Sequence, residues 1–150
     1  MNTYGQTYSG KFDPKFPEKY IGDAKNIVWR SSWERKAMIY FDEHPKVISW
    51  ASEEKFVRYW HPFKKKPARY FPDFIVKMRT KSGVRVFMVE VKPFSKCHEP
   101  KKKGKVTKGY VAEMAEWKVN QAKWAAAREY CETNGVSFII LTEKELNVKF

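Results

Sequence analysis

The chain has 150 residues, of which 43% are hydrophobic and 17% aromatic, so a disordered chain is excluded and one domain with a real core is expected. Its 30 Lys and Arg outnumber its 17 Asp and Glu, and the formal net charge of +13 makes nucleic acid the expected partner. No apolar stretch is long enough to span a membrane, and the opening residues do not resemble a secretory signal. Two cysteines imply no disulfide framework, so we expect an intracellular, reduced protein.

The first segment of the chain, residues 1–29, is rich in Gly, Pro, Tyr and Lys and shows no sustained period. We interpret it as an N-terminal arm or irregular wrap, and residues 30–150 as one domain. Apolar side chains recur every four residues across 31–43, which predicts a helix. We expect this helix to end at His44, because Pro45 disfavours helical geometry for the residue before it.

The rest of the chain alternates between strand and helix patterns. Alternating apolar residues on both sides of Lys81-Ser82-Gly83 predict a hairpin, and Asn134-Gly135 is a good end for an alanine-rich helix. Strands are expected at 47–50, 56–60, 73–79, 84–91 and 136–141, and helices at 110–134 and from 142. This order predicts an α/β fold, a central mixed β-sheet flanked by helices.

Three charged residues stand at the end of the predicted hairpin. Glu90 and Lys92 are two residues apart on one strand, so they share a face, and the pairing brings Asp73 beside them. Buried carboxylates that lie together need a compensating cation, and their hard oxygen atoms suit Mg²⁺ or Mn²⁺. We predict that Asp73 and Glu90 bind one or two such ions. Lys92 would then support the attacking water or the transition state of phosphodiester hydrolysis.

Each of these residues also has a purely structural interpretation. Asp73 follows a proline and suits a turn cap, while Glu90 and Lys92 suit a solvated ion pair on an edge strand. Ser31-x-x-Glu34 is a capping box, in which Glu34 would accept a hydrogen bond from the backbone of Ser31. Cys97-His98, even with the other histidines, matches no common zinc spacing.

Two basic segments flank the candidate site, and the second, residues 96–108, also has the composition of a mobile loop. We predict that both clamp the DNA backbone, with binding that is largely independent of sequence and weakened by salt. The predicted DNA-binding residues are Lys64, Lys65, Lys66, Arg69, Lys96, Lys101, Lys102, Lys103, Lys105 and Lys108.

The pattern Pro72-Asp73 followed by Glu90-Val91-Lys92 resembles the PD-(D/E)xK nuclease superfamily. The superfamily core usually begins with a helix that carries another acid, and Glu34 lies on such a helix here. The resemblance implies a restriction-endonuclease-like core with Glu34 among the catalytic residues. It also implies that the main-chain carbonyl of Val91 joins Asp73 and Glu90 as a metal ligand.

A closer resemblance covers most of the chain. Segments 29–34, 47–53, 69–74 and 90–93 look like those of the head-completion nucleases of T-even-like tailed bacteriophages, which are related to the end-cleaving subunit of heteromeric transposases. The transposase-type site commonly has Gln where Glu90 stands, so this chain keeps a full acidic ligand. The resemblance implies an endonuclease acting on double-stranded DNA after head packaging and before tail joining.

That resemblance also implies phage head or neck proteins as partners and a location in the host cytoplasm during assembly, or on the virion. A double-strand cut by one small domain usually needs a second active site, so a homo-oligomer is one expected arrangement. Two alternatives stay open: a non-catalytic head plug with a nuclease-like fold, and a transposition or repair endonuclease. A plug has no use for the Asp73, Glu90 and Lys92 cluster.

Overall fold

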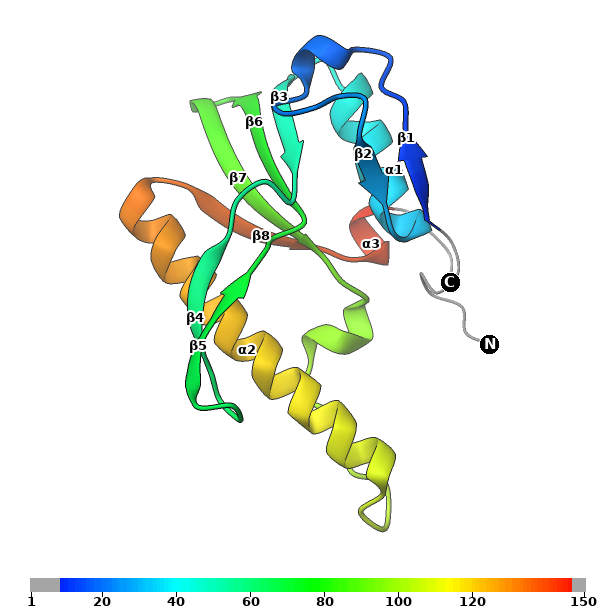
Figure 1. Ribbon diagram of the computed structural model, residues 1–150, viewed down its shortest axis with the longest axis vertical. Helices are drawn as coiled ribbons and strands as arrows, with labels where there is room; N and C mark the ends of the chain where they lie inside the picture. Colours follow the sequence, from blue (N-terminus) through cyan, green and yellow to red (C-terminus); the bar gives the residue numbers. More distant parts are fainter. Residues whose placement is uncertain (1–8, 147–150) are drawn as a thin grey trace.

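A computed structural model describes residues 9–146 and centres on a four-stranded sheet of order β3-β6-β7-β8 (Figure 1). Its strands β3, β6 and β7 are antiparallel, and β8 runs parallel to β7. The bounds are Val47–Ser52 for β3, Phe74–Thr80 for β6, Gly83–Val91 for β7 and Ser137–Leu141 for β8. The predicted mixed sheet is therefore confirmed.

The two long helices end where the sequence predicts, and the second begins two residues earlier than expected, at Lys108. Helix α1 (Ser32–Glu43) is capped by Ser31, whose side chain accepts the N–H of Glu34. Helix α2 (Lys108–Asn134) is capped by Thr107 and ends at Gly135, which takes the left-handed φ of 68° that favours glycine. A short α3 (Glu143–Leu146) follows β8.

The sheet has a separate apolar cluster on each face. On the α1 face, the fully buried Trp50 packs with Trp33, Met38 and Phe74, among others. On the α2 face, Met88 of β7 packs against Trp124, Ala127 and Cys131 of α2. Since successive residues of a strand point to opposite faces, Glu90 and Lys92 lie on the same face as Met88.

The segment interpreted as an arm contains regular structure within its described part. Strands β1 (Gly10–Phe12) and β2 (Ile27–Trp29) pair antiparallel, with the short 3-10 helix η1 (Pro17–Lys19) between them. The buried side chains of Phe12, Tyr20 and Ile27 join the cluster on the α1 face. The segment is thus part of the domain core, although residues 1–8 lie outside the described part of the chain.

A second hairpin, β4 (Val57–His61) and β5 (Lys66–Tyr70), packs beside α2 (Figure 1). The sequence predicted β4, but β5 falls in the segment expected only to be basic. After β7, the 3-10 helix η2 (Phe94–Cys97) leads into an irregular stretch that reaches Thr107. No helix within residues 9–146 is long and apolar enough to cross a lipid bilayer.

Candidate active site

Strand register brings Asp73 and Glu90 together. Phe74 pairs with Val89, so one further step along each strand places Asp73 opposite Glu90. One carboxylate oxygen of Asp73, Oδ2, accepts the backbone N–H of Val91 at 2.7 Å. This bond fixes the orientation of the Asp73 side chain at the end of the β6–β7 pair.

Glu90 is held on two sides. Its side chain is buried, with the residue only 6% exposed, and Oε1 accepts the hydroxyl of Tyr70 at 2.6 Å. The other oxygen, Oε2, lies 3.5 Å from Nζ of Lys92, which is itself half-buried. The backbone N–H of Lys92 donates to the carbonyl of Leu141, so β8 holds the lysine in place. The structure therefore brings Asp73, Glu90 and Lys92 together, as the sequence predicted.

Glu34 binds the backbone at the start of α1, though not in the predicted capping box, and it also adds charge to this cluster. Its Oε1 accepts the backbone N–H of Arg30 at 3.0 Å, one residue earlier than the expected Ser31. Burial raises the pKa of Glu34, and the charges of Glu53 and Glu90 act in the same direction against the Arg30 hydrogen bond. The side chain of Glu34 therefore both binds the backbone at the start of α1 and lies beside the acidic site.

The surroundings of Asp73 disfavour its ionised form. Burial raises the pKa of Asp73 well above its ordinary value, and the charges of Glu90 and Glu34 raise it further. The Val91 N–H and the Lys92 ammonium act in the opposite direction without cancelling the effect. The site therefore favours the binding of an additional cation.

No three His, Cys, Asp or Glu side chains of residues 9–146 are grouped closely enough to hold a metal ion by themselves. A cation between Asp73 and Glu90 would therefore need a further oxygen, such as the Val91 carbonyl. The thiol of Cys97 donates to the carbonyl of Pro93.

Further residues near the cluster were not among the predicted site residues. Tyr70 donates to Glu90 from the end of β5, and Lys123 reaches in from α2 with Nζ 5.8 Å from the centre of the Tyr70 ring. Burial and the charge of Lys92 lower the pKa of Lys123. Neither contact has a local sequence signal, because each depends on how β5 and α2 pack on the sheet.

Glu53 also lies beside the cluster, just beyond β3. Its backbone N–H donates to the carbonyl of Asp73, and its carboxylate accepts from Arg30 at 2.6 Å. Its φ of 53° is in the left-handed region, which is unfavourable for a residue with a side chain. The hydrogen bonds to Asp73 and Arg30 hold this conformation.

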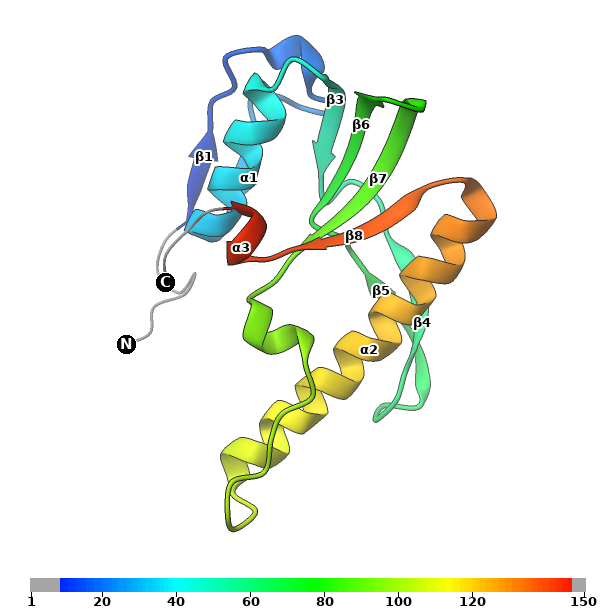
Figure 2. The ribbon, with the colours of Figure 1, turned by 180° about the vertical axis from the view of Figure 1, so that it is seen from behind.

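Nine of the ten predicted DNA-binding residues lie on two projections, and Lys96 lies on η2. Lys64 and Lys65 form the tip of the β4–β5 hairpin, whereas Lys101 to Lys108 precede or begin α2. In both ribbon views these projections extend beyond the end of the sheet where β6 begins and β7 ends (Figures 1 and 2). All ten side chains are exposed except Lys96, which is half-buried and pairs with Glu116 at 3.1 Å.

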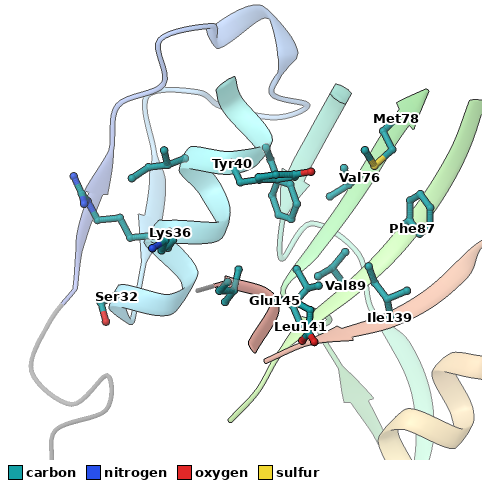
Figure 3. A pocket seen from close by; sticks show the side chains of 14 residues that line it. Ser32, Lys36, Tyr40, Val76, Met78, Phe87, Val89, Ile139, Leu141 and Glu145 are labelled. Atoms are coloured by element: carbon teal, nitrogen blue, oxygen red, sulfur yellow. The ribbon is translucent and has the colours of Figure 1, made fainter. Parts of the chain in front are cut away.

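A cavity of about 880 Å³ lies on the opposite face of the sheet, between α1, α3 and the sheet strands (Figure 3). Its lining is mainly apolar and includes Met78, Phe87 and Ile139, with Tyr40 and Glu145 at its edge. Asp73, Glu90 and Lys92 do not line it. This cavity is thus separate from the charged cluster.

Asp73 and Glu90 lie opposite each other at the end of the antiparallel β6–β7 pair in a mixed sheet, and Lys92 follows Glu90 by two residues. This is the layout of a PD-(D/E)xK nuclease. The family model described as "TnsA-like endonuclease N terminal" matches residues 44–143, and the chain belongs to this endonuclease family. The head completion nuclease of Enterobacteria phage T4 is 38% identical over 143 residues, which is 93% of each chain. No solved structure matches the chain.

Proposed function

We propose that this protein is a divalent-metal-dependent DNA endonuclease that acts in phage head completion, after DNA packaging and before tail joining. The observation that carries the proposal is the opposition of Asp73 and Glu90, with Lys92 against Glu90. The match to an endonuclease family supports the chemistry, and the similarity to a head completion nuclease supports the biological step.

Asp73, Glu90 and the Val91 carbonyl would hold the metal ion, with Glu34 nearby. All of these donors are hard oxygen atoms, which fits Mg²⁺ or Mn²⁺. Oδ2 of Asp73 is engaged with the Val91 N–H, so its other oxygen is the one left to face a cation. When bound, the ion would polarise a phosphate oxygen and lower the pKa of a bound water.

The lysines supply the remaining positive charge. Lys92 would orient the attacking water or offset the negative charge that develops on the phosphate, because its ammonium already lies at the buried carboxylate. Lys123 would contribute to the same role from α2. Tyr70 would keep the Glu90 carboxylate in position through its hydroxyl.

Double-stranded DNA is the proposed substrate, with its phosphates on the hairpin tip and on the lysines that precede α2. We further propose that the protein works in the host cytoplasm during assembly and contacts head or neck proteins of the virion. A second copy would supply the second active site for a double-strand cut.

The test is cleavage of supercoiled plasmid with Mg²⁺ or Mn²⁺. Asp73→Asn and Lys92→Ala should abolish metal-dependent nicking or linearisation, while the exposed Asp13→Asn should cut like the wild type, because Asp13 lies outside the cluster. Circular dichroism would confirm that each variant is folded. Cleavage that survives in Asp73→Asn would refute the assignment, and a folded wild type that binds DNA without cutting it would favour a structural head plug.

A further inference from the structure

The β4–β5 hairpin and its flanks have an unusual composition. From Lys55 to Pro72 there is no acidic residue, and the cations Lys55, Arg58, Lys64, Lys65, Lys66 and Arg69 alternate with aromatic residues. The inner face of the hairpin, with Val57, Tyr59 and Tyr70, is buried against α2. The outer face is therefore where the remaining aromatic and basic side chains are displayed.

Cross-strand pairing arranges this outer face as a ladder. Arg58 pairs with Arg69, and Trp60 pairs with Pro67. Just before Arg58 and just after Arg69 on the same face, the rings of Phe56 and Phe71 lie 5.5 Å apart. The ladder thus runs from an aromatic pair through a pair of guanidinium groups to an exposed tryptophan.

Several of these side chains are far more exposed than their chemistry favours. Trp60 is 58% exposed, and Phe63 at the hairpin turn is 52% exposed. A row of such rings on a surface usually marks a binding site.

The two arginines have no acidic partner within residues 9–146. Like charges directly across two strands are destabilising, and here the guanidinium of Arg69 lies over the Phe56 ring at 5.3 Å instead of an anion. The outer face of the hairpin therefore suits an anionic ligand that also has flat apolar surfaces.

The hairpin is joined directly to the carboxylate cluster. Tyr70, the last residue of β5, donates to Glu90, and Asp73 follows three residues later. At the other end, the pKa of His61 is lowered by partial desolvation and by the charges of Lys64, Lys123 and Lys66. The Phe56–Phe71 end of the ladder is therefore the end of the hairpin that adjoins the carboxylate cluster along the chain.

We propose that the outer face of the β4–β5 hairpin binds unpaired, single-stranded DNA, with bases stacked on Trp60 and the Phe56–Phe71 pair and phosphates on Arg58 and Arg69. A duplex hides the faces of its bases, so lysines and arginines alone would suffice to bind it. Alternating rings and cations are what proteins use for single strands. The inference rests on the proposed function and narrows its substrate to DNA that has an unpaired segment next to a duplex.

The test is binding without cleavage, with the full-length protein in EDTA. Fluorescence anisotropy would compare a labelled oligothymidylate of about 15 nucleotides with a duplex of the same length. The variants are Trp60→Ala, Trp60→Phe and, as a matched control, Tyr40→Ala, since Tyr40 is an exposed aromatic residue of α1. Thermal unfolding would confirm that the variants are folded.

Trp60→Ala should weaken oligothymidylate binding by about 5- to 100-fold, the range expected for one stacked base. Duplex binding should change little, Trp60→Phe should keep most of the affinity, and Tyr40→Ala should match the wild type. Equal losses for both DNA forms would overturn the proposal in favour of duplex contact. No loss for either form would overturn it in favour of a protein partner.

Plasmid cleavage by the same variants separates the two proposals. If the wild type does not cut, the proposed function fails, whereas the binding comparison in EDTA still decides the strand preference. If the wild type cuts and Trp60→Ala binds both DNA forms like the wild type, only the single-strand inference fails.

Discussion

The hydrogen bond from Tyr70 to Glu90 should be a large contributor to the stability of the candidate active site. It is short, at 2.6 Å, it is buried, and its acceptor is a carboxylate. Burial and the charge of Glu90 raise the pKa of Tyr70, so the hydroxyl keeps its proton at every workable pH. Tyr70→Phe removes this donor and leaves the ring in place.

A hydrogen bond to a charged group contributes about 1.5–3 kcal/mol, and its loss in a chain of this length should lower the midpoint of thermal unfolding by about 3–12 °C. The matched control is Tyr59→Phe, because Tyr59 packs on the same face of the same hairpin and in the same apolar cluster. Differential scanning calorimetry of the metal-free protein at pH 7 would give both values.

A double-mutant cycle would attribute the loss to the carboxylate. In a Glu90→Gln background the same Tyr70→Phe change should cost only about 0.5–1.5 kcal/mol, because the bond is then between neutral groups. If Tyr70→Phe is no more destabilising than Tyr59→Phe, or if its effect is the same in both backgrounds, the hydrogen bond does not stabilise the charged Glu90 and this reasoning is wrong.

Two further predictions concern the acidic site and the basic loop. The pKa of Asp73 is raised in the folded protein, so the metal-free wild type should lose stability as pH rises from the ordinary Asp value of about 3.9 through the folded pKa. Asp73→Asn should therefore be more stable than the wild type at pH 7 in EDTA and should lose this advantage in acid. Urea unfolding at several pH values checks this, with Asp13→Asn as the control. A stability difference that does not change with pH would contradict it. Replacing Lys101, Lys102 and Lys103 by Ala should reduce the slope of log K against log salt for duplex binding by about 2–3, because each phosphate contact contributes about 0.9. A triple change of Lys25, Lys46 and Lys81, which are exposed elsewhere, should leave the slope unchanged, and equal slopes for the two triple variants would remove the loop from the DNA interface.

The strands that carry the candidate active site were predictable because their signals are local. Apolar alternation on both sides of Lys81-Ser82-Gly83 fixes the β6–β7 hairpin, and the two-residue period places Glu90 and Lys92 on one face. The turn then determines that Asp73 lies opposite Glu90. Family membership adds the chemistry of this arrangement, which spacing alone leaves open.

The β5 strand was not predictable in the same way. Of its residues only Ala68 and Tyr70 turn toward the core, while Lys66, Pro67 and Arg69 are exposed, so an apolar period is absent. Proline is tolerated there because β5 is an edge strand of a two-stranded sheet. The role of Tyr70 follows from this packing and has no signal of its own.

The N-terminal segment failed to show a period for a different reason. Phe12, Tyr20 and Ile27 each enter the core from a separate short piece of chain, so no single helix or strand repeats. Asp42 anchors this segment by accepting the backbone N–H groups of Lys15 and Phe16 at 2.8 and 3.0 Å. Such long-range contacts are invisible to any local pattern.

Under the proposed function, the two basic projections at one end of the sheet would also affect the kinetics of DNA binding. Concentrated positive charge speeds the encounter with DNA by about 10- to 1000-fold at low salt, and lets a protein slide along a duplex before it dissociates. The hairpin tip and the lysines before α2 extend beyond the end of the sheet where β6 begins and β7 ends (Figures 1 and 2), the end that carries Asp73 and Glu90. If these residues bind DNA as proposed, the net charge of +13 would shorten the search for DNA and make the encounter rate fall as the salt concentration rises.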